Sequence, residues 1–254
     1  MRKIKRMSYK CPSDVCLPSV SCRKTDVGPD PIADMDWATL FGRAGDAGVD
    51  AEDVREALAR HRGRTEKREG ETDREGETDR KGETDREGEA GGDGATEDPP
   101  EPSPARIVAD ADVLAADLLV GETSREALES VWRHSWIELL ASDLLLSDAE
   151  AVIAELSTPD LAADWRDLVE DWREPVAHPA GDHPGLASAY RGGAMHLLSF
   201  DRVLSSPRAG AELRGRVPLS VREPRAFALV FDAESLYLEV GGDEYPGPDR
   251  PPRV

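Results

Sequence analysis

The chain has 254 residues, of which 52 are Asp or Glu and 32 are Lys or Arg, so its formal net charge at pH 7 is −20. This length suits one α/β domain of ordinary size with tails, or two small domains. No stretch approaches the ~18 consecutive apolar residues of a membrane span, and no apolar region follows the basic start. We therefore expect a cytoplasmic protein with no membrane partner.

The acidic surplus lies on a chain with only six Lys, none of them after Lys81. An acid-rich surface keeps a protein hydrated at high salt, where the Debye length shrinks to ~3 Å at 1 M. We therefore expect a halophilic source.

Residues 1–34 differ in composition from the rest, since they hold seven basic and four acidic residues and all three cysteines. These cysteines have no nearby His to complete a structural zinc site, and their odd number does not indicate a disulfide framework. We expect either a basic disordered arm or an upstream extension that is not translated, with translation beginning at Met35.

Residues 35–62 are predicted to form a short helical segment. Asp50 is placed to cap a helix, and Val54, Ala57 and Leu58 share one of its faces. This apolar face is too small for independent folding. The segment is therefore expected to dock elsewhere or to fray, and it is a candidate binding site for a protein partner.

A hexapeptide repeat follows, with G-E-T-D-R-E at Gly70 and Gly82 and G-E-T-D-R-K at Gly76. A six-residue period is typical of a β-helix, but this repeat has no apolar residue to bury. Because Gly, Pro and charged residues continue to Pro104, residues 63–104 are predicted to be a disordered acidic linker.

Strand and helix patterns alternate over residues 105–240. The predicted strands lie near residues 107–111, 137–141, 195–200 and 217–221. The predicted helices lie near residues 112–120, 124–134, 145–156, 161–172 and 184–191. This alternation is typical of an α/β fold, here a three-layer α/β/α sandwich with a parallel sheet of four to five strands. Residues 241–254 are predicted to be a disordered tail.

Acidic residues stand at the junctions of these elements. Asp110 ends the first strand, Asp182 precedes a helix, and Asp201 follows the next strand. Because ligand sites of such sheets lie at the carboxyl ends of the strands, we expect these three acids to converge on one pocket.

Here the chain resembles the PIN-domain nucleases, metal-dependent ribonucleases with an α/β/α sandwich, and in particular those of the haloarchaeal type. The family's first strand ends in D-x-N-V or similar, matched by D-A-D-V at residues 110–113. Its later signature, an acid before L-A-x-A and then A-x-x-L-x-[ST]-x-D, is matched over residues 182–201, and its closing P-x-x-F over residues 224–227. The resemblance covers about residues 106–231.

The resemblance also implies an acid on the helix after the second strand. A capping box between Ser147 and Glu150 would give Glu150 a structural role. Glu155 and Asp148 lie seven positions apart and therefore share one side of that helix. We predict Glu155 as the ligand, with Asp148 as an alternate. A further alternate is Asp112, which stands where the family usually has Asn and which otherwise caps the following helix.

Carboxylates that converge repel one another unless a cation lies between them, and oxygen ligands suit Mg²⁺ or Mn²⁺. Such an ion would orient and deprotonate a water for in-line attack on phosphorus. The predicted function is a metal-dependent endoribonuclease that hydrolyses RNA phosphodiester bonds. Its predicted catalytic and metal-binding residues are Asp110, Glu155, Asp182 and Asp201.

An Arg-rich stretch follows Asp201. Guanidinium groups suit phosphate oxygens, so RNA contacts are predicted for four of its residues. These are Arg202, Arg208, Arg214 and Arg216. A solvated face that offsets neighbouring acids is the alternative.

Two other functions stay open. D-A-D-V at residues 110–113 also resembles the D-x-D-x-[TV] nucleophile motif of haloacid-dehalogenase-type phosphatases, although these usually need a Lys to hold the phosphate and none follows Lys81. A PIN-like fold can also act without catalysis as a module that binds RNA or protein. The sequence does not decide between a monomer and a homodimer.

Overall fold

The computed structural model describes residues 35–45, 48–76, 99–178, 183–206, 208–210, 218–241 and 243–253. The predictions for residues 1–34 and for Asp182, Arg214 and Arg216 lie outside these described residues. The chain divides into two units, Met1–Asp34 and Met35–Val254, and every described residue belongs to the second.

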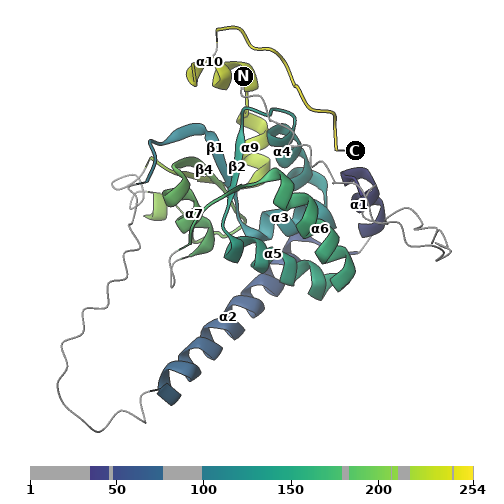
Figure 1. Ribbon diagram of the computed structural model, residues 1–254, viewed down its shortest axis with the longest axis vertical. Helices are drawn as coiled ribbons and strands as arrows, with labels where there is room; N and C mark the ends of the chain where they lie inside the picture. The colour runs from purple at the N-terminus through teal and green to yellow at the C-terminus, as the bar shows by residue number, and fades with distance from the viewer. Residues whose placement is uncertain are drawn as a thin grey trace, which may run out of the picture. The chain divides into compact units, whose positions relative to one another are not determined.

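In this second unit, the described residues include a sheet of five parallel strands in the order β3-β2-β1-β4-β5 (Figure 1). The strands are β1 (Ser103–Ala109), β2 (Glu138–Ala141), β3 (Glu174–Pro175), β4 (Ala194–Leu198) and β5 (Ser220–Arg222). The central strand β1 is buried on both faces, with Ile107, Val108 and Ala109 fully inaccessible. The predicted α/β sandwich with a parallel sheet is confirmed.

Helices flank this sheet on both sides. They are α1 (Trp37–Ala44), α2 (Ala51–Gly76), α3 (Ala111–Leu119), α4 (Glu122–Trp132), α5 (Asp143–Leu156), α6 (Pro159–Trp172), α7 (Pro184–Gly192), α9 (Pro224–Val230) and α10 (Ala233–Glu239). Figure 1 shows α7 on the opposite side of the sheet from α3, α5 and α6. Right-handed crossovers require this, because the chain reverses its direction across the sheet after β3. None of the described helices is long and apolar enough to cross a membrane.

The strand order reverses between β1 and β4. After β1 the chain runs toward β2, whereas after β4 it runs toward β5, so the two connections leave neighbouring strands in opposite directions. A crevice opens at such a point, and the ligand sites of open α/β sheets lie there. Asp110 directly follows β1 and Ser199 directly follows β4.

Helix α5 begins earlier than the sequence pattern indicated. Ser142 caps it, and its Oγ accepts a hydrogen bond from the Leu145 N–H at 3.3 Å. The predicted capping box at Ser147 and Glu150 is therefore wrong, because a competent cap already follows β2 directly. Both residues lie inside the helix.

The N-terminal helices pack on the domain. Val54 and Ala57 are fully buried and Leu58 is nearly so, and α2 contacts both α3 and α5. Asp50 caps α2 as predicted, since its Oδ1 accepts the N–H groups of Glu52 and Asp53. The apolar face of residues 35–62 thus docks on the chain's own domain.

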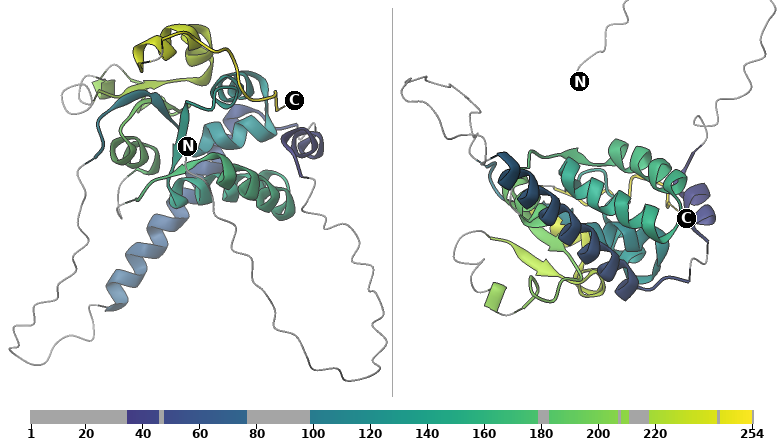
Figure 2. Two further views of the ribbon diagram at one scale, coloured as in Figure 1. Left: turned by 45° about the horizontal axis from the view of Figure 1, so that its top comes forward. Right: turned by 90° about the horizontal axis from the view of Figure 1, so that it is seen from below.

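Helix α2 also extends into the predicted linker (Figure 2). The prediction of disorder is wrong for residues 63–76, which are helical, and for residues 103–104, which belong to β1. Once residues 51–62 are anchored, each further residue adds a hydrogen bond at little cost, and the Glu and Arg that follow are good helix formers. The rest of the repeat lies outside the described residues.

The prediction of a disordered tail is wrong for residues 243–253. The Arg253 side chain is fully buried, and it donates hydrogen bonds to both carboxylate oxygens of Asp117 at 2.8 and 3.0 Å and to Glu129 at 3.1 Å. Three rings lie 5.1 to 5.3 Å from its guanidinium carbon, namely Trp37, Phe41 and Trp172. A charged side chain anchors this tail, which a search for apolar patterns does not detect.

Candidate functional site

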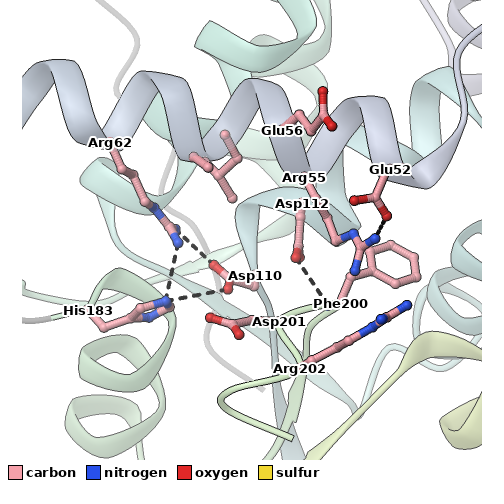
Figure 3. Close-up of a pocket in the computed structure, with 12 residues that line it drawn as sticks. Glu52, Arg55, Glu56, Arg62, Asp110, Asp112, His183, Phe200, Asp201 and Arg202 are labelled. Carbon is pink, nitrogen blue, oxygen red and sulfur yellow. Dashed lines mark hydrogen bonds and ion pairs between the residues drawn. The ribbon is translucent and has the colours of Figure 1, made fainter.

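A cavity of about 500 Å³ lies at the carboxyl ends of β1 and β4 and is covered by α2 (Figure 3). Arg62 enters it from α2, Asp110 and Asp112 from the start of α3, and Asp201 from the loop after β4. His183 contributes from the start of α7. The cavity therefore occupies the point where the strand order reverses, as the sheet topology requires.

Asp110 is fixed by the elements that meet there. It caps α3, and its Oδ1 accepts the Ala111 N–H at 2.9 Å, while its Oδ2 accepts a hydrogen bond from the Ser199 hydroxyl at 3.1 Å. Gly185 of α7 packs against the carboxyl group, since a Cβ there would lie 3.3 Å from Asp110 Cγ. The carboxylate is 99 % buried and has little freedom to rotate.

Asp112 is buried beside it with an incomplete set of partners. Its Oδ2 accepts the Phe200 N–H at 3.1 Å, but no described residue bonds to its buried Oδ1. Burial, and next the negative charge of Asp110, raise the pKa of Asp112 well above its usual value. A buried carboxylate oxygen without a donor is unfavourable, so this position favours a cation.

Asp148, on the second turn of α5, joins the cluster through Arg62. The Arg62 Nε donates to Asp148 Oδ2 at 2.8 Å, and its Nη2 donates to Asp110 Oδ1 at 3.0 Å. Its Nη1 lies 3.2 Å from His183 Nε2, and His61 Nε2 lies 3.4 Å from Asp148 Oδ1. Two carboxylates from different elements thus share one guanidinium.

The charge of Arg62 is stabilised in this position. Burial alone lowers the pKa of its guanidinium, but the charges and hydrogen bonds of Asp110 and Asp148 outweigh burial and raise the pKa. Arg62 therefore remains a cation that compensates the buried carboxylates.

The structure does not bring Glu155 to this cluster. Glu155 lies two turns beyond Asp148 on α5, where its carboxylate accepts hydrogen bonds from Arg64 at 2.9 Å and Arg60 at 3.0 Å. The hydrogen bond from Arg64, and next that from Arg60, lower the pKa of Glu155. Of the two acids considered for α5, the alternate Asp148 is the one near Asp110.

The remaining predicted residues divide by position. Asp201 and Arg202 line the cavity, and Asp201 Oδ1 also accepts the Val203 N–H at 2.6 Å. Arg208 lies farther along the same connection and does not line the cavity. Asp182 is outside the described residues, although its neighbour His183 lies in the cavity.

Arg62 is the central site residue that the sequence patterns did not indicate; His183, Ser199 and Phe200 were not predicted as site residues either. Arg62 belongs to R-H-R-G-R at residues 60–64, three Arg and a His without an acid in a strongly acidic chain. This local reversal of charge was the available signal.

The donor set of the cavity fits Mg²⁺ or Mn²⁺. Among the described residues, no three His, Cys, Asp or Glu form a ready-made ligand group. However, Mg²⁺ keeps several waters and commonly takes only one or two protein carboxylates. The free Oδ1 of Asp112, together with the carboxylates that Arg62 bridges, offers hard oxygen ligands with an excess of negative charge.

Residues 101–253 match the model of a family of unknown function, DUF7384. The chain belongs to this family. The DUF7384 region contains Asp110, Asp112, Asp148 and Asp201, whereas Arg62 and the rest of α2 precede it. No curated protein and no solved structure shows significant similarity to the chain.

Proposed function

We propose that this DUF7384 protein is a metal-dependent ribonuclease whose cluster of Asp110, Asp112 and Asp148 holds Mg²⁺ or Mn²⁺. The observation that carries the proposal is Asp112, a carboxyl group 97 % buried beside a second buried carboxyl group, with one oxygen that accepts no hydrogen bond from a described residue. Arg62 bonds to Asp110, but no described residue offers a donor to this oxygen of Asp112, and a buried carboxyl pair is unfavourable without such compensation. The PIN-like order of acidic motifs in the sequence supports the same chemistry.

The residues around the cluster would orient its ligands. The Ser199 hydroxyl donates a hydrogen bond to Asp110, and the Phe200 N–H donates one to Asp112. Both carboxylates are therefore oriented in the absence of a metal ion. Asp201 adds a further carboxylate to the cavity. When bound, Mg²⁺ or Mn²⁺ would supply an activated water for attack on phosphorus, and a second ion, if present, would stabilise the departing 3′-oxygen.

Residues that line the cavity would bind the RNA. Arg202 lines the cavity, is exposed, and forms no ion pair with a described residue, so its guanidinium is available to a phosphate. Phe200 also lines the cavity, and stacking of a base on such a ring is worth about 1–3 kcal/mol. The net charge of −20 predicts weak non-specific binding, so recognition would depend on these local contacts.

Cleavage of a labelled single-stranded RNA by chelator-treated protein, with and without Mn²⁺ at constant molar KCl, tests the proposal. We expect Mn²⁺-dependent cleavage that is lost in Asp110→Asn and Asp148→Asn. Glu155→Gln is the matched control, because it neutralises an acid of the same helix outside the cluster, and it should retain cleavage.

Two results would replace the proposal with another function. If both the wild type and Arg62→Ala, which removes the guanidinium from the cluster, bind RNA without cleaving it, the protein is a non-catalytic module. Hydrolysis of a phosphomonoester without RNA cleavage would identify a phosphatase.

A further inference from the structure

Arg62 bonds to the carboxylates that the proposed metal ion would use. Its guanidinium lies 3.0 Å from Asp110 Oδ1 and 2.8 Å from Asp148 Oδ2, and Figure 3 shows it pointing from α2 into the cavity. A metal ion bound to Asp110 would lie about 2 Å from a carboxylate oxygen, and so next to the guanidinium. Two cations held by the same carboxylate oxygen at such short range repel each other, so Arg62 and the metal ion would compete for that oxygen.

The neighbours of Arg62 on α2 are paired with the same acidic surface. Arg60 and Arg64 both bond to Glu155, and His61 faces Asp148. The basic segment at residues 60–64 therefore covers the acidic side of α5 from Asp148 to Glu155. Helix α2 precedes the residues that match the DUF7384 model.

The basic segment is held differently from the start of α2. Val54, Ala57 and Leu58 are buried, but after Leu58 none of the described side chains of α2 is buried. Ion pairs therefore hold the second half, and apart from those of Arg62, whose partners are buried, these pairs are exposed and contribute little to stability. Gly63 also weakens the helix directly after Arg62, and a Cβ there would meet nothing within 4 Å.

We propose that α2 is an intramolecular inhibitor, and that the cluster is occupied either by Arg62 or by a divalent metal ion, but not by both. The inference rests on the proposed metal-dependent function. Unwinding of α2 from its C-terminal end to residue 62 would free the cluster while Val54 and Leu58 keep the start of the helix on the domain.

Mn²⁺ binding to chelator-treated full chain, measured by calorimetry and by the shift in melting temperature at constant KCl, tests this proposal. Arg62→Ala should bind Mn²⁺ at least about tenfold more tightly than the wild type, because the competing cation is gone. Arg64→Ala is the matched control. It removes an exposed Arg two positions away whose one ion-pair partner among the described residues is Glu155, so the Mn²⁺ affinity of this variant should stay within about twofold of the wild type.

A second variant strengthens the inhibitor without touching the cluster. Gly63→Ala raises helix propensity at an open position, so it should favour the closed state and weaken the apparent Mn²⁺ affinity by about fivefold. This variant also decides the case if Arg62→Ala does not fold, since an unchanged or tighter Mn²⁺ affinity in Gly63→Ala would then overturn the proposal.

The failure of this inference differs from failure of the proposed function. If the wild type and Arg62→Ala bind Mn²⁺ equally and Asp110→Asn does not bind it, the metal site stands and the inhibitor is overturned. If no variant binds Mn²⁺, including Arg62→Ala, the metal-dependent function fails, and the competition fails with it.

Discussion

Replacing Arg253 by Met tests the link between the C-terminal tail and the N-terminal helices. The substitution keeps much of the side-chain volume but removes a cation whose side chain is fully buried. It leaves Asp117, which is 2 % exposed, without its two hydrogen bonds from Arg253. It also removes the guanidinium from beneath the rings of Trp37 and Phe41, which belong to α1.

The expected cost follows from this burial. Removing one partner of a buried, hydrogen-bonded ion pair typically destabilises a protein by about 3–5 kcal/mol, because the other charge stays buried without compensation. In a unit of this size each kcal/mol corresponds to about 2–4 °C in melting temperature, so we expect a decrease of about 6–20 °C.

Urea and thermal unfolding of Arg253→Met, followed by circular dichroism, measure this loss. The double variant Arg253→Met/Asp117→Asn also removes the uncompensated charge of Asp117, so it should recover much of the lost stability. Arg250→Met is the control on the same tail. Among the described residues, the Arg250 side chain donates only a 3.4 Å hydrogen bond to the Trp132 carbonyl and lies over the Trp132 ring, so its loss should cost less than about 1 kcal/mol. An equally small loss in Arg253→Met would refute the buried anchor.

Three further predictions concern the sheet and the cluster. Burial, with a smaller effect of the Arg222 charge, lowers the pKa of His196, so the unfolded chain binds the proton more readily and stability falls as the pH drops through 6.5 toward the lower folded pKa. His196→Phe should flatten this part of the pH profile of urea unfolding, and an unchanged slope would contradict the assignment. Gly193→Ala should destabilise by at least about 1 kcal/mol in the same assay, because φ is +66° and the new Cβ would lie 2.8 Å from the Pro100 carbonyl oxygen, and wild-type stability would argue against that contact. Ser199→Ala should weaken Mn²⁺ binding about 10- to 100-fold in calorimetry, since it frees the Asp110 carboxylate, whereas full affinity would exclude this orienting role.

The fold was largely predictable because its signal is local. The run at residues 107–109 is apolar because β1 is buried on both faces, and the helices between the strands show their apolar faces in the sequence. The two-residue β3 is too short for a pattern. The extension of α2 and the ordered tail depend on anchoring by other parts of the chain, which periodicity does not report.

The site was predictable only in part. Asp110 and Asp112 follow a recognisable strand, so their position at the edge of the sheet could be inferred. Asp148 and Glu155 share one side of α5. Because this helix begins directly after its cap Ser142, its start determines how far each of the two acids lies from the sheet. Seven residues of helix are about 10 Å, which places Asp148 near the sheet edge and Glu155 beyond it.

Arg62 could not be assigned from local pattern. Its partners Asp110 and Asp148 lie 48 and 86 positions away, across the repeat. The positive charge of the segment at residues 60–64 predicts contacts with acidic side chains, but a chain with 52 Asp and Glu has many acidic side chains that it could contact. Only the packing of Val54 and Leu58 on the domain selects which carboxylates it meets.

The most direct measurement is an anomalous difference map from crystals of Arg62→Ala soaked in millimolar MnCl₂. We expect a Mn²⁺ peak at the cluster of Asp110, Asp112 and Asp148, within coordination distance of a carboxylate oxygen. A map with no peak at this cluster, or with Mn²⁺ bound only elsewhere, would contradict it.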